Sequence, residues 1–555
     1  MARAIHSRLK INGKLVAETP LHVGGIGGNS DTDMALAVNG KDELYVPGTS
    51  IAGVSRAWCE RNFTEKDKDG NDAPIKEIKE LFGFQKDDSG QASFVLVEDA
   101  TIENAKDILT EIRDGVGIDR YYGVAAEGAK YDREILPKGT KLNFEMIVEI
   151  ADRKLKPKEK RKNTSDIYDE TEEQFERRIK ETKAIFGHLL EALQKGELRF
   201  GGSRTRGLGK LKLTDSSFKE QNFNGYANTL KVLKNEFEDV VITDETKKSI
   251  EFKEKPRLDI SIEWSPVQPL MVKAGFEGIG VDMLPLTSQK ENGKVSLVLP
   301  GSSIKGSLRS QAERIMRTLL GNYETKGENL HEQIKIPLVD EIFGAKAEKG
   351  GNGTKGLGAL AIDDCFAEKT FDTETWNDVT TGKTTMTENK KEVEVSFGQQ
   401  PLWLALEKIK HKPKDENGEE TSQEIMSFAI EHHNAIDRFT GGTADGALYS
   451  VLAPTKISWD KMQFSLDFSR TENPRQCLML LLLVLRDLTE NRLPLGFATN
   501  RGMGEVKVKS IKLKGKNLEG FENEIVLNEG KMSKLDKTFK ENLAEEWKKW
   551  LTKQK

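Results

Sequence analysis

Two segments far apart in the chain alternate apolar and polar residues with a period of two. They are LKINGKLVAE at residues 9–18 and RLDISIEWSP at residues 257–266, and this pattern predicts strands of a sheet with one buried face. Apolar positions at helical spacing predict an amphipathic helix after the second segment: Ile304, Leu308, Ala312, Ile315 and Leu319. Further helices are predicted near residues 173–194 and 476–491. The order strand, helix, strands, helix, strand in each half predicts an α+β class with a ferredoxin-like arrangement.

A series of six short segments occurs twice in the same order. The first set is LHVGG (21–25), DMALAV (33–38), YVPGTSIAGVSR (45–56), LFG (81–83), IDRYYG (118–123) and SRTRGLGKLKL (203–213). The second set is PLMVKAG (269–275), DMLPL (282–286), LVLPGSSIKGSLR (297–309), IFG (342–344), IDRFTGG (436–442) and TNRGMGEVKV (499–508). Six matches in one order indicate two copies of a module fused in tandem.

The distance between matching positions shows where the two copies differ in length. The prolines of PGTS and PGSS are 253 positions apart (300 − 47), whereas the aspartates of the two IDR segments are 318 apart (437 − 119). The second copy therefore gains 65 residues (318 − 253), which we place within about 368–433. The offset falls to 295 (502 − 207) at the closing glycines, so the first copy carries 23 extra residues (318 − 295), for which the charged run at about 152–173 is the candidate. We accordingly expect a first module over residues 1–245, a second over 246–530 and a C-terminal helix over 531–555.

Composition narrows the class of protein without deciding its function. The chain has 555 residues, 85 Lys and Arg, 32% charged residues and a net charge of −5. Its longest apolar run, residues 478–485, is far shorter than the roughly 20 residues that cross a bilayer, and the N-terminus shows no apolar signal core, so we expect a cytoplasmic protein without a membrane partner. Cys59, Cys365 and Cys477 form no CxxC pair, which argues against a disulfide framework or a thiolate zinc site. Nucleic acid stays possible, because phosphate binding depends on local clusters of cations.

Each copy places a Pro-Gly corner before a predicted helix, PGTS at residues 47–50 and PGSS at residues 300–303. The hydroxyl side chains are expected to cap the helix that follows. Such a helix start offers backbone N–H groups and the positive end of its dipole to an anion, and Arg56 and Arg309 follow at matching positions. An anion site and a plain N-cap both fit this pattern. A Walker loop does not, because GxxxxGK[ST] is absent.

The closing loop of each copy combines glycines with arginines. Arg204, Arg206 and Gly207 lie in the first copy, and Arg501 and Gly502 lie in the second. Glycine lets the backbone approach a bulky ligand, and arginine binds phosphate at two points. A structural turn with solvated arginines is the alternative interpretation.

The corner, the IDR segment and the glycine loop together resemble the RAMP superfamily of CRISPR-associated proteins. The resemblance is strongest to the type III backbone subunits, the "Cas seven" group, here with two subunits fused in one chain. Its most specific marks are PG[TS]SIxGxxR, IDRxxG and the terminal RGxG loop. The resemblance implies RRM-like modules that bind CRISPR guide RNA beside other effector subunits. It also implies a β-hairpin thumb after each IDR segment, near residues 121–136 and 439–453, which opens the duplex of guide and target RNA.

The resemblance also implies a catalytic loop aspartate in each module. The matching positions are Asp33 and Asp282, expected to hold Mg²⁺ or a similar divalent metal and to support cleavage of the paired target RNA. A displaced nucleotide reaches an in-line geometry more readily than a stacked one, so a single carboxylate suffices. The candidate RNA-binding residues are His22, Ser50, Arg56, Arg120, Arg204, Arg206, Gly207, Ser303, Lys305, Arg309, Arg438, Arg501 and Gly502.

The two copies are not identical at these positions. His22 is replaced by Met271 in the second copy, and Lys305 corresponds to Ala52 in the first. The two modules are therefore expected either to cut at different rates or to include one that does not cut. Three other functions stay open: a scaffold that binds guide RNA without cutting, a metal-independent enzyme that processes the guide precursor, and a two-module scaffold for a ligand other than nucleic acid.

Overall fold

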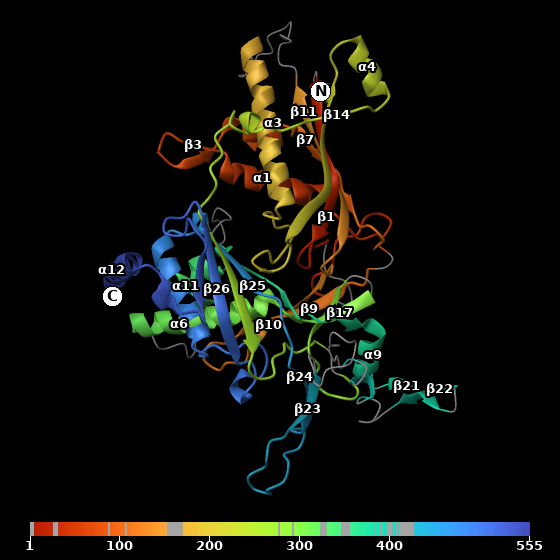
Figure 1. Ribbon diagram of the computed structural model, residues 1–555, viewed down its shortest axis with the longest axis vertical. Helices are drawn as coiled ribbons and strands as arrows, with labels where there is room; N and C mark the ends of the chain where they lie inside the picture. The colour runs from red at the N-terminus through yellow and green to blue at the C-terminus, as the bar shows by residue number, and fades with distance from the viewer. Residues whose placement is uncertain are drawn as a thin grey trace, which may run out of the picture.

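The computed structural model describes most of the chain. The described residues are 5–25, 32–86, 89–105, 108–151, 170–275, 278–290, 293–321, 330–345, 356–381, 383–388, 391–396, 402, 404–406, 409 and 427–554. Most of the charged run expected near 152–173 and much of the expected insertion lie outside them. Figure 1 shows two α+β halves, the first above the second in that view.

The first half is built on one antiparallel sheet of five strands. Its order is β14 (Glu238–Asp239), β13 (Leu211–Asn222), β1 (Ile5–Ala17), β11 (Lys141–Ala151) and β7 (Val95–Val97). Helices α1 (Gly48–Asn62) and α3 (Glu172–Gln194) pack on this sheet, and their apolar side chains form one core with it. The alternation at residues 9–18 places Leu9, Ile11 and Leu15 in that core, as the sequence predicts.

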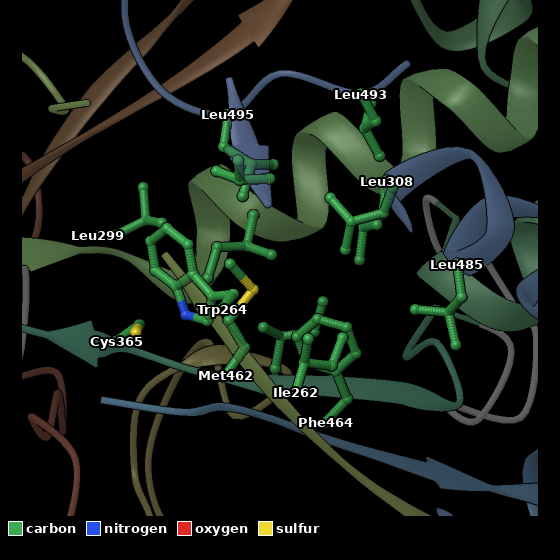
Figure 2. Packing of buried hydrophobic residues seen from close by; sticks show 14 of the residues in the cluster. Ile262, Trp264, Leu299, Leu308, Cys365, Met462, Phe464, Leu485, Leu493 and Leu495 are labelled. Atoms are coloured by element: carbon green, nitrogen blue, oxygen red, sulfur yellow. The ribbon is translucent and has the colours of Figure 1, made fainter. Parts of the chain in front are cut away.

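The second half has a sheet of six strands. Its order is β12 (Arg206–Gly207), β18 (Leu360–Asp363), β25 (Met462–Asp467), β15 (Arg257–Pro266), β26 (Val506–Lys516) and β27 (Ile525–Asn528). Helices α6 (Gly301–Leu320) and α11 (Pro474–Thr489) close its core, part of which is drawn in Figure 2. There Leu308 of α6 and Leu485 of α11 lie with Ile262, Trp264 and Phe464 of the sheet. The apolar run at residues 478–485 is thus core, and no helix of the described residues is long and apolar enough to span a bilayer.

The two sheets repeat one arrangement. In chain order each half gives strand, helix, strand, strand, helix, strand, and the four shared strands lie side by side as β13-β1-β11-β7 and β26-β15-β25-β18. In both halves the first strand lies between the fourth and the third. The duplication predicted from the motif series is therefore present in the fold.

Shorter elements complete the description. The first half contains β2 (Tyr45–Val46), β3 (Thr64–Lys66), β4 (Asp72–Pro74), α2 (Lys76–Phe82), β5 (Phe84–Lys86), β6 (Ser89–Gln91), β8 (Ala100–Thr101), α4 (Tyr226–Leu233) and α5 (Asp244–Lys247). The second contains β16 (Thr287–Lys290), β17 (Lys294–Leu299), α7 (Leu330–Gln333), α8 (Val339–Phe343), β19 (Cys365–Phe366), η3 (Phe468–Arg470), η4 (Thr499–Arg501) and η5 (Met532–Lys534).

Each half carries a β-hairpin outside its sheet. The first pairs β9 (Glu111–Ile118) with β10 (Ala125–Ile135), and the second pairs β23 (Ser427–His433) with β24 (Tyr449–Thr455). The second hairpin extends from the lower edge of the molecule in Figure 1. The expected thumb ranges are wrong in one respect: the IDR segments connect the two strands of each hairpin rather than preceding it. The strand β23 consequently belongs to the second hairpin, although its residues fell within the expected insertion.

The IDR aspartates explain that placement. The Asp119 carboxylate accepts the backbone N–H groups of Tyr121 and Tyr122, both at 2.8 Å. The Asp437 carboxylate does the same for the residues two and three positions on, at 2.7 and 3.0 Å. These hydrogen bonds lower the pKa of both aspartates. An aspartate that binds the backbone ahead of it forms a turn, so the motif lies at the hairpin connection.

The first part of the expected insertion and the C-terminal helix pack on the second half. Within the insertion the structure describes β20 (Phe371–Asp372), α9 (Thr373–Thr381), β21 (Lys383–Glu388) and β22 (Lys391–Ser396). Trp376 of α9 joins the second core. The predicted C-terminal helix is α12 (Lys537–Gln554), which buries Leu543 and Trp547 in the same core.

Candidate functional site

Asp33 is exposed and held against the second strand of the first hairpin. Its backbone N–H donates to Oδ1 of Asp132 at 2.7 Å, and the N–H of Asp132 donates to Oδ2 of Asp33 at 3.0 Å. The two aspartates therefore anchor each other, which fixes the loop that follows the first strand to the base of the first hairpin.

Asp282 is held in the same way in the second half. Its Oδ2 accepts the backbone N–H of Ser450 at 2.7 Å and the Ser450 hydroxyl at 2.8 Å, and its own N–H lies 3.1 Å from that hydroxyl oxygen. These hydrogen bonds lower the pKa of Asp282 because they favour its ionised form. Asp282 is also exposed.

The two anchors are equivalent positions. Asp132 and Ser450 are 318 apart (450 − 132), the same offset as the IDR aspartates. Each half thus holds an exposed aspartate, Asp33 or Asp282, at the base of its hairpin. Sequence analysis did not identify Asp132 and Ser450. The offset of 318 would have matched the two positions, but the difference between their side chains hid the match. Among the described residues no three His, Cys, Asp or Glu side chains gather as a metal cluster.

His22, a candidate RNA-binding residue, lies in the interior of the first half. It is 6% exposed, and its Nδ1 lies 2.7 Å from the backbone oxygen of Glu134. Burial lowers its pKa. Met271 takes the same place in the second half and is also buried. The backbone oxygen of His22 accepts the N–H of Gly202, and that of Met271 accepts the N–H of Phe497, so both residues are tied to the closing loop of their half.

The corner hydroxyls do not cap the helices, and that prediction is wrong. α1 and α6 begin directly after Pro47 and Pro300, so the hydroxyl residues lie within the helices, and no hydroxyl side chain caps either helix start. The first N–H of each helix donates instead to an aspartate that lies just after a strand of the same half. Gly48 donates to Asp99, which follows β7, and Gly301 donates to Asp364, which follows β18, both at 2.8 Å. The protein's own carboxylate therefore occupies the expected anion position. Ser50 and Ser303 lie inside the first turns, partly exposed.

The helix arginines bind the FG loops of their own halves. Arg56 Nη1 lies 3.1 Å from the Gly83 oxygen, and Arg309 Nη1 lies 2.6 Å from the Gly344 oxygen. Each arginine also pairs with the glutamate four positions on, at 2.7 Å in both halves. This contact explains why PGxSIxGxxR and the FG segment recur together.

Lys305 is a buried residue of α6. It is 4% exposed and donates to the backbone oxygen of Leu360 at 2.6 Å. Burial holds its pKa well below the usual value for lysine.

The glycine loop of the first half joins the sheet of the second. Arg206 and Gly207 form β12, which pairs in parallel with Ile362 and Asp363 of β18. Gly207 has a φ of 98°, and a Cβ on it would lie 1.9 Å from Oδ1 of Asp364. Only glycine fits at this junction.

The first hairpin reaches α6 of the second half. Arg120 Nε lies 2.5 Å from Glu313, and its backbone N–H donates to Gln333 at 2.8 Å. Arg199 and Arg113 add ion pairs to Asp363 and Asp364, at 2.5 and 3.6 Å. Arg120, expected to contact RNA, is therefore engaged between the halves.

The remaining candidate arginines are more open. Arg206, Arg438 and Arg501 are exposed, and Gly502 lies exposed beside Arg501. The Arg501 guanidinium lies 5.7 Å from the ring centre of Tyr449 on the second hairpin. Arg204 lines a cavity of about 1930 Å³ between the halves, where burial and nearby Arg470 and Arg61 lower its pKa.

Two halves of one topology, each with an exposed aspartate anchored to a hairpin, define a duplicated α+β module. The chain belongs to the RAMP superfamily, whose family model matches residues 14–212 and 266–507. A protein from Methanocaldococcus jannaschii named "CRISPR system Cms endoribonuclease Csm3" is 27% identical over 229 residues, which cover 38% of this chain and 80% of that protein. A protein of the same name from Streptococcus thermophilus is 28% identical over 222 residues, which cover 37% of this chain and 86% of that protein.

Proposed function

We propose that this chain is a guide-RNA-binding backbone subunit of a type III CRISPR effector complex, and that each half cleaves the paired target RNA once. The observation that carries the proposal is the equal anchoring of two exposed aspartates, Asp33 by Asp132 and Asp282 by Ser450. Relatives named as endoribonucleases of a CRISPR system support the reaction class.

The strand order supports an RNA-binding fold. A central first strand between the fourth and the third, with two helices on the sheet, is the ferredoxin-like order that RRM-type modules use. Exposed aromatic side chains at the hairpin connections suit the stacking of unpaired bases, with Tyr122 67% and Phe439 99% exposed. Arg206, Arg438 and Arg501 supply exposed cations for the phosphates.

The carboxylates of the two sites suit a divalent cation whose remaining ligands are phosphate oxygens of the substrate and water. Mg²⁺ prefers carboxylate oxygens and is commonly held by one or two of them together with phosphate oxygens and water. Asp33 with the neighbouring Asp132 would supply these oxygens in the first half, and Asp282 would supply them in the second. When bound, the cation stabilises charge on the phosphate and activates the attacking oxygen. The chain's own residues hold the carboxylates in place and keep Asp282 ionised.

Cleavage of target RNA by the assembled complex tests this function. With Mg²⁺ we expect two cuts at regular spacing, and with EDTA none. Binding without cuts in Mg²⁺ would show a non-catalytic scaffold. Cutting of a guide precursor by the isolated chain in EDTA would show a processing enzyme. A native protein that copurifies without RNA, and fails to bind guide RNA when it is supplied, would contradict every RNA-based function.

A further inference from the structure

Each half holds one exposed arginine of its closing loop against a tyrosine of its hairpin. The Arg501 guanidinium lies 5.7 Å from the ring centre of Tyr449. Nη1 of Arg206 lies 3.4 Å from the hydroxyl oxygen of Tyr131. The tyrosines are 318 positions apart (449 − 131) and the arginines are 295 apart (501 − 206). These are the offsets of the hairpins and of the closing loops, so the contact belongs to the repeated module.

The two tyrosine rings are fixed by the opposite strand of each hairpin. Tyr449 is paired with His433, and their rings stack with centroids 5.2 Å apart at an angle of 19°. Tyr131 is paired with Gly115, and a Cβ added to that glycine would lie 2.3 Å from Cζ of Tyr131. Gly115 and His433 are themselves equivalent, 318 positions apart (433 − 115). Each ring therefore lies across the neighbouring strand, in the first half over a glycine that leaves room for it.

Each tyrosine directly precedes the residue that anchors the proposed cleavage aspartate. Tyr131 precedes the anchor of Asp33, and Tyr449 precedes the anchor of Asp282. Because each aspartate accepts the backbone N–H of its anchor, it lies along the edge of the strand, while the arginine contacts the residue just before. Neighbouring residues of one strand thus hold a carboxylate and a guanidinium close to each other.

The arginines are not neutralised by carboxylates. Within the described part of the chain, Arg206 and Arg501 form no ion pair, and both are exposed. In the first half the Arg133 guanidinium lies 5.5 Å from the ring centre of Tyr131, so two guanidiniums gather around this ring. Val451 stands at the position of Arg133 in the second half. An exposed arginine that is held in place without a carboxylate suits a phosphate.

We propose that Tyr131 and Tyr449 are positioning residues, which hold Arg206 and Arg501 against a target-RNA phosphate beside the bond that each half cleaves. The assignment rests on the proposed function and adds the strand that each arginine binds. The target strand is favoured over the guide because the arginine and the cleavage aspartate are held by neighbouring residues. A guanidinium that is fixed beforehand loses less freedom on binding than a mobile one.

Single neutral phosphates in the target test the contact. A methylphosphonate removes one backbone charge, and it is placed in turn at each phosphate flanking the two cuts. In the wild-type complex, one such position at each cut should slow that cut by about three- to tenfold. In Arg501→Gln the neutral phosphate at the second cut should cause no further loss, because both changes remove one interaction. Tyr449→Ala should behave likewise, and Arg206→Gln should do so at the first cut.

Phenylalanine distinguishes the two kinds of contact. Tyr449→Phe keeps the ring beside Arg501 and should recover most of the rate that Tyr449→Ala loses. Tyr131→Phe lacks the hydroxyl that Arg206 contacts, so it should recover little of the loss in Tyr131→Ala. Tyr226→Ala removes a tyrosine that is 81% exposed on α4, and as the matched control it should leave both cuts unchanged. Thermal unfolding checks that each variant is folded.

Binding of the same targets in EDTA separates this contact from cleavage. Coupling between an arginine variant and one target phosphate would support the contact, and binding with coupling but no cut in Mg²⁺ would overturn only the proposed cleavage. Independent effects at every target phosphate, or coupling to guide phosphates alone, would overturn the positioning role and leave the proposed function standing. A complex that binds no RNA would overturn both.

Discussion

Ser450 donates two hydrogen bonds to one oxygen of Asp282, from its backbone N–H at 2.7 Å and its hydroxyl at 2.8 Å. The equivalent position in the first half is Asp132, which donates to Asp33 only through its backbone. One half therefore holds its aspartate with a neutral hydroxyl, and the other places a second carboxylate beside it. The two sites are built alike but differ in local charge.

Replacing Ser450 by alanine should slow only the cut assigned to the second half. The hydroxyl bond helps to hold an exposed carboxylate in position, so we expect the rate of that cut to fall by up to about tenfold. The pKa of Asp282 is depressed in the folded protein, and its ionised form is lost as pH falls through that pKa. Removing a donor raises this pKa, so the acid limb of the pH–rate profile should move to higher pH. The other cut in the same reaction is the control, and an unmoved acid limb would contradict the assignment.

Alanine at Gly207 should disturb the junction, and alanine at Gly502 should not. Both glycines have positive φ, so both changes cost about 1 kcal/mol in backbone strain. Only at Gly207 would the new Cβ also collide with Asp364. We expect a fall in melting temperature of about 2–4 °C for Gly502→Ala and a clearly larger one for Gly207→Ala. Calorimetry measures both, and equal losses would argue against a tight junction.

Arg309 should matter more for stability than its counterpart Arg56. The side chains of Arg309 and Glu313 are 14% and 3% exposed, whereas those of Arg56 and Glu60 are 37% and 31% exposed. Without Arg309, Glu313 keeps only Arg120, and Asp340 loses its ion pair with Arg309. Loss of a buried charge partner costs up to about 3–5 kcal/mol, but breaking an exposed pair costs about 1 kcal/mol or less. Chemical unfolding of Arg309→Leu and Arg56→Leu should show this order. Arg309→Lys should recover only part of the loss, since lysine lacks the fork that reaches both Gly344 and Glu313.

Asp364 should make stability depend on pH. Burial raises the pKa of its carboxyl to about 6, above the ordinary 3.8. The folded state therefore binds the proton more tightly, and the free energy of unfolding falls as pH rises from about 4 to about 6. Asp364→Asn keeps an oxygen for the Gly301 N–H but does not ionise. The free energy of unfolding of this variant should change less between about pH 4.5 and pH 7 than that of the wild type, by up to about 2–3 kcal/mol. A variant with the wild-type pH dependence would contradict this assignment.

The sequence predicted the parts of this protein that depend on local pattern. Period-two alternation located β1 and β15, helical spacing located α6, and the ordered motifs revealed the duplication. The carboxylate caps could not be predicted, because Asp99 and Asp364 lie 51 and 63 positions from the N–H groups they bind. Local patterns suggested the nearby hydroxyls instead, and tertiary packing decided otherwise.

The candidate site was predicted in position but not in its contacts. Asp33 and Asp282 were named from a family resemblance, whereas their anchors lie 99 and 168 positions away. Arg120 and Arg56 carry the same charge in the sequence as Arg501. Only the fold distinguishes arginines that bind protein carboxylates from those that remain exposed.

The most direct test of the central claim is to map the cuts made by aspartate variants. Asparagine keeps an acceptor for the hairpin hydrogen bonds while removing the charge that would hold a cation. With one guide and one end-labelled target, Asp33→Asn and Asp282→Asn should each lose a different product. The double variant should bind the target without cutting it. Unchanged products from the double variant would contradict the assignment of both aspartates.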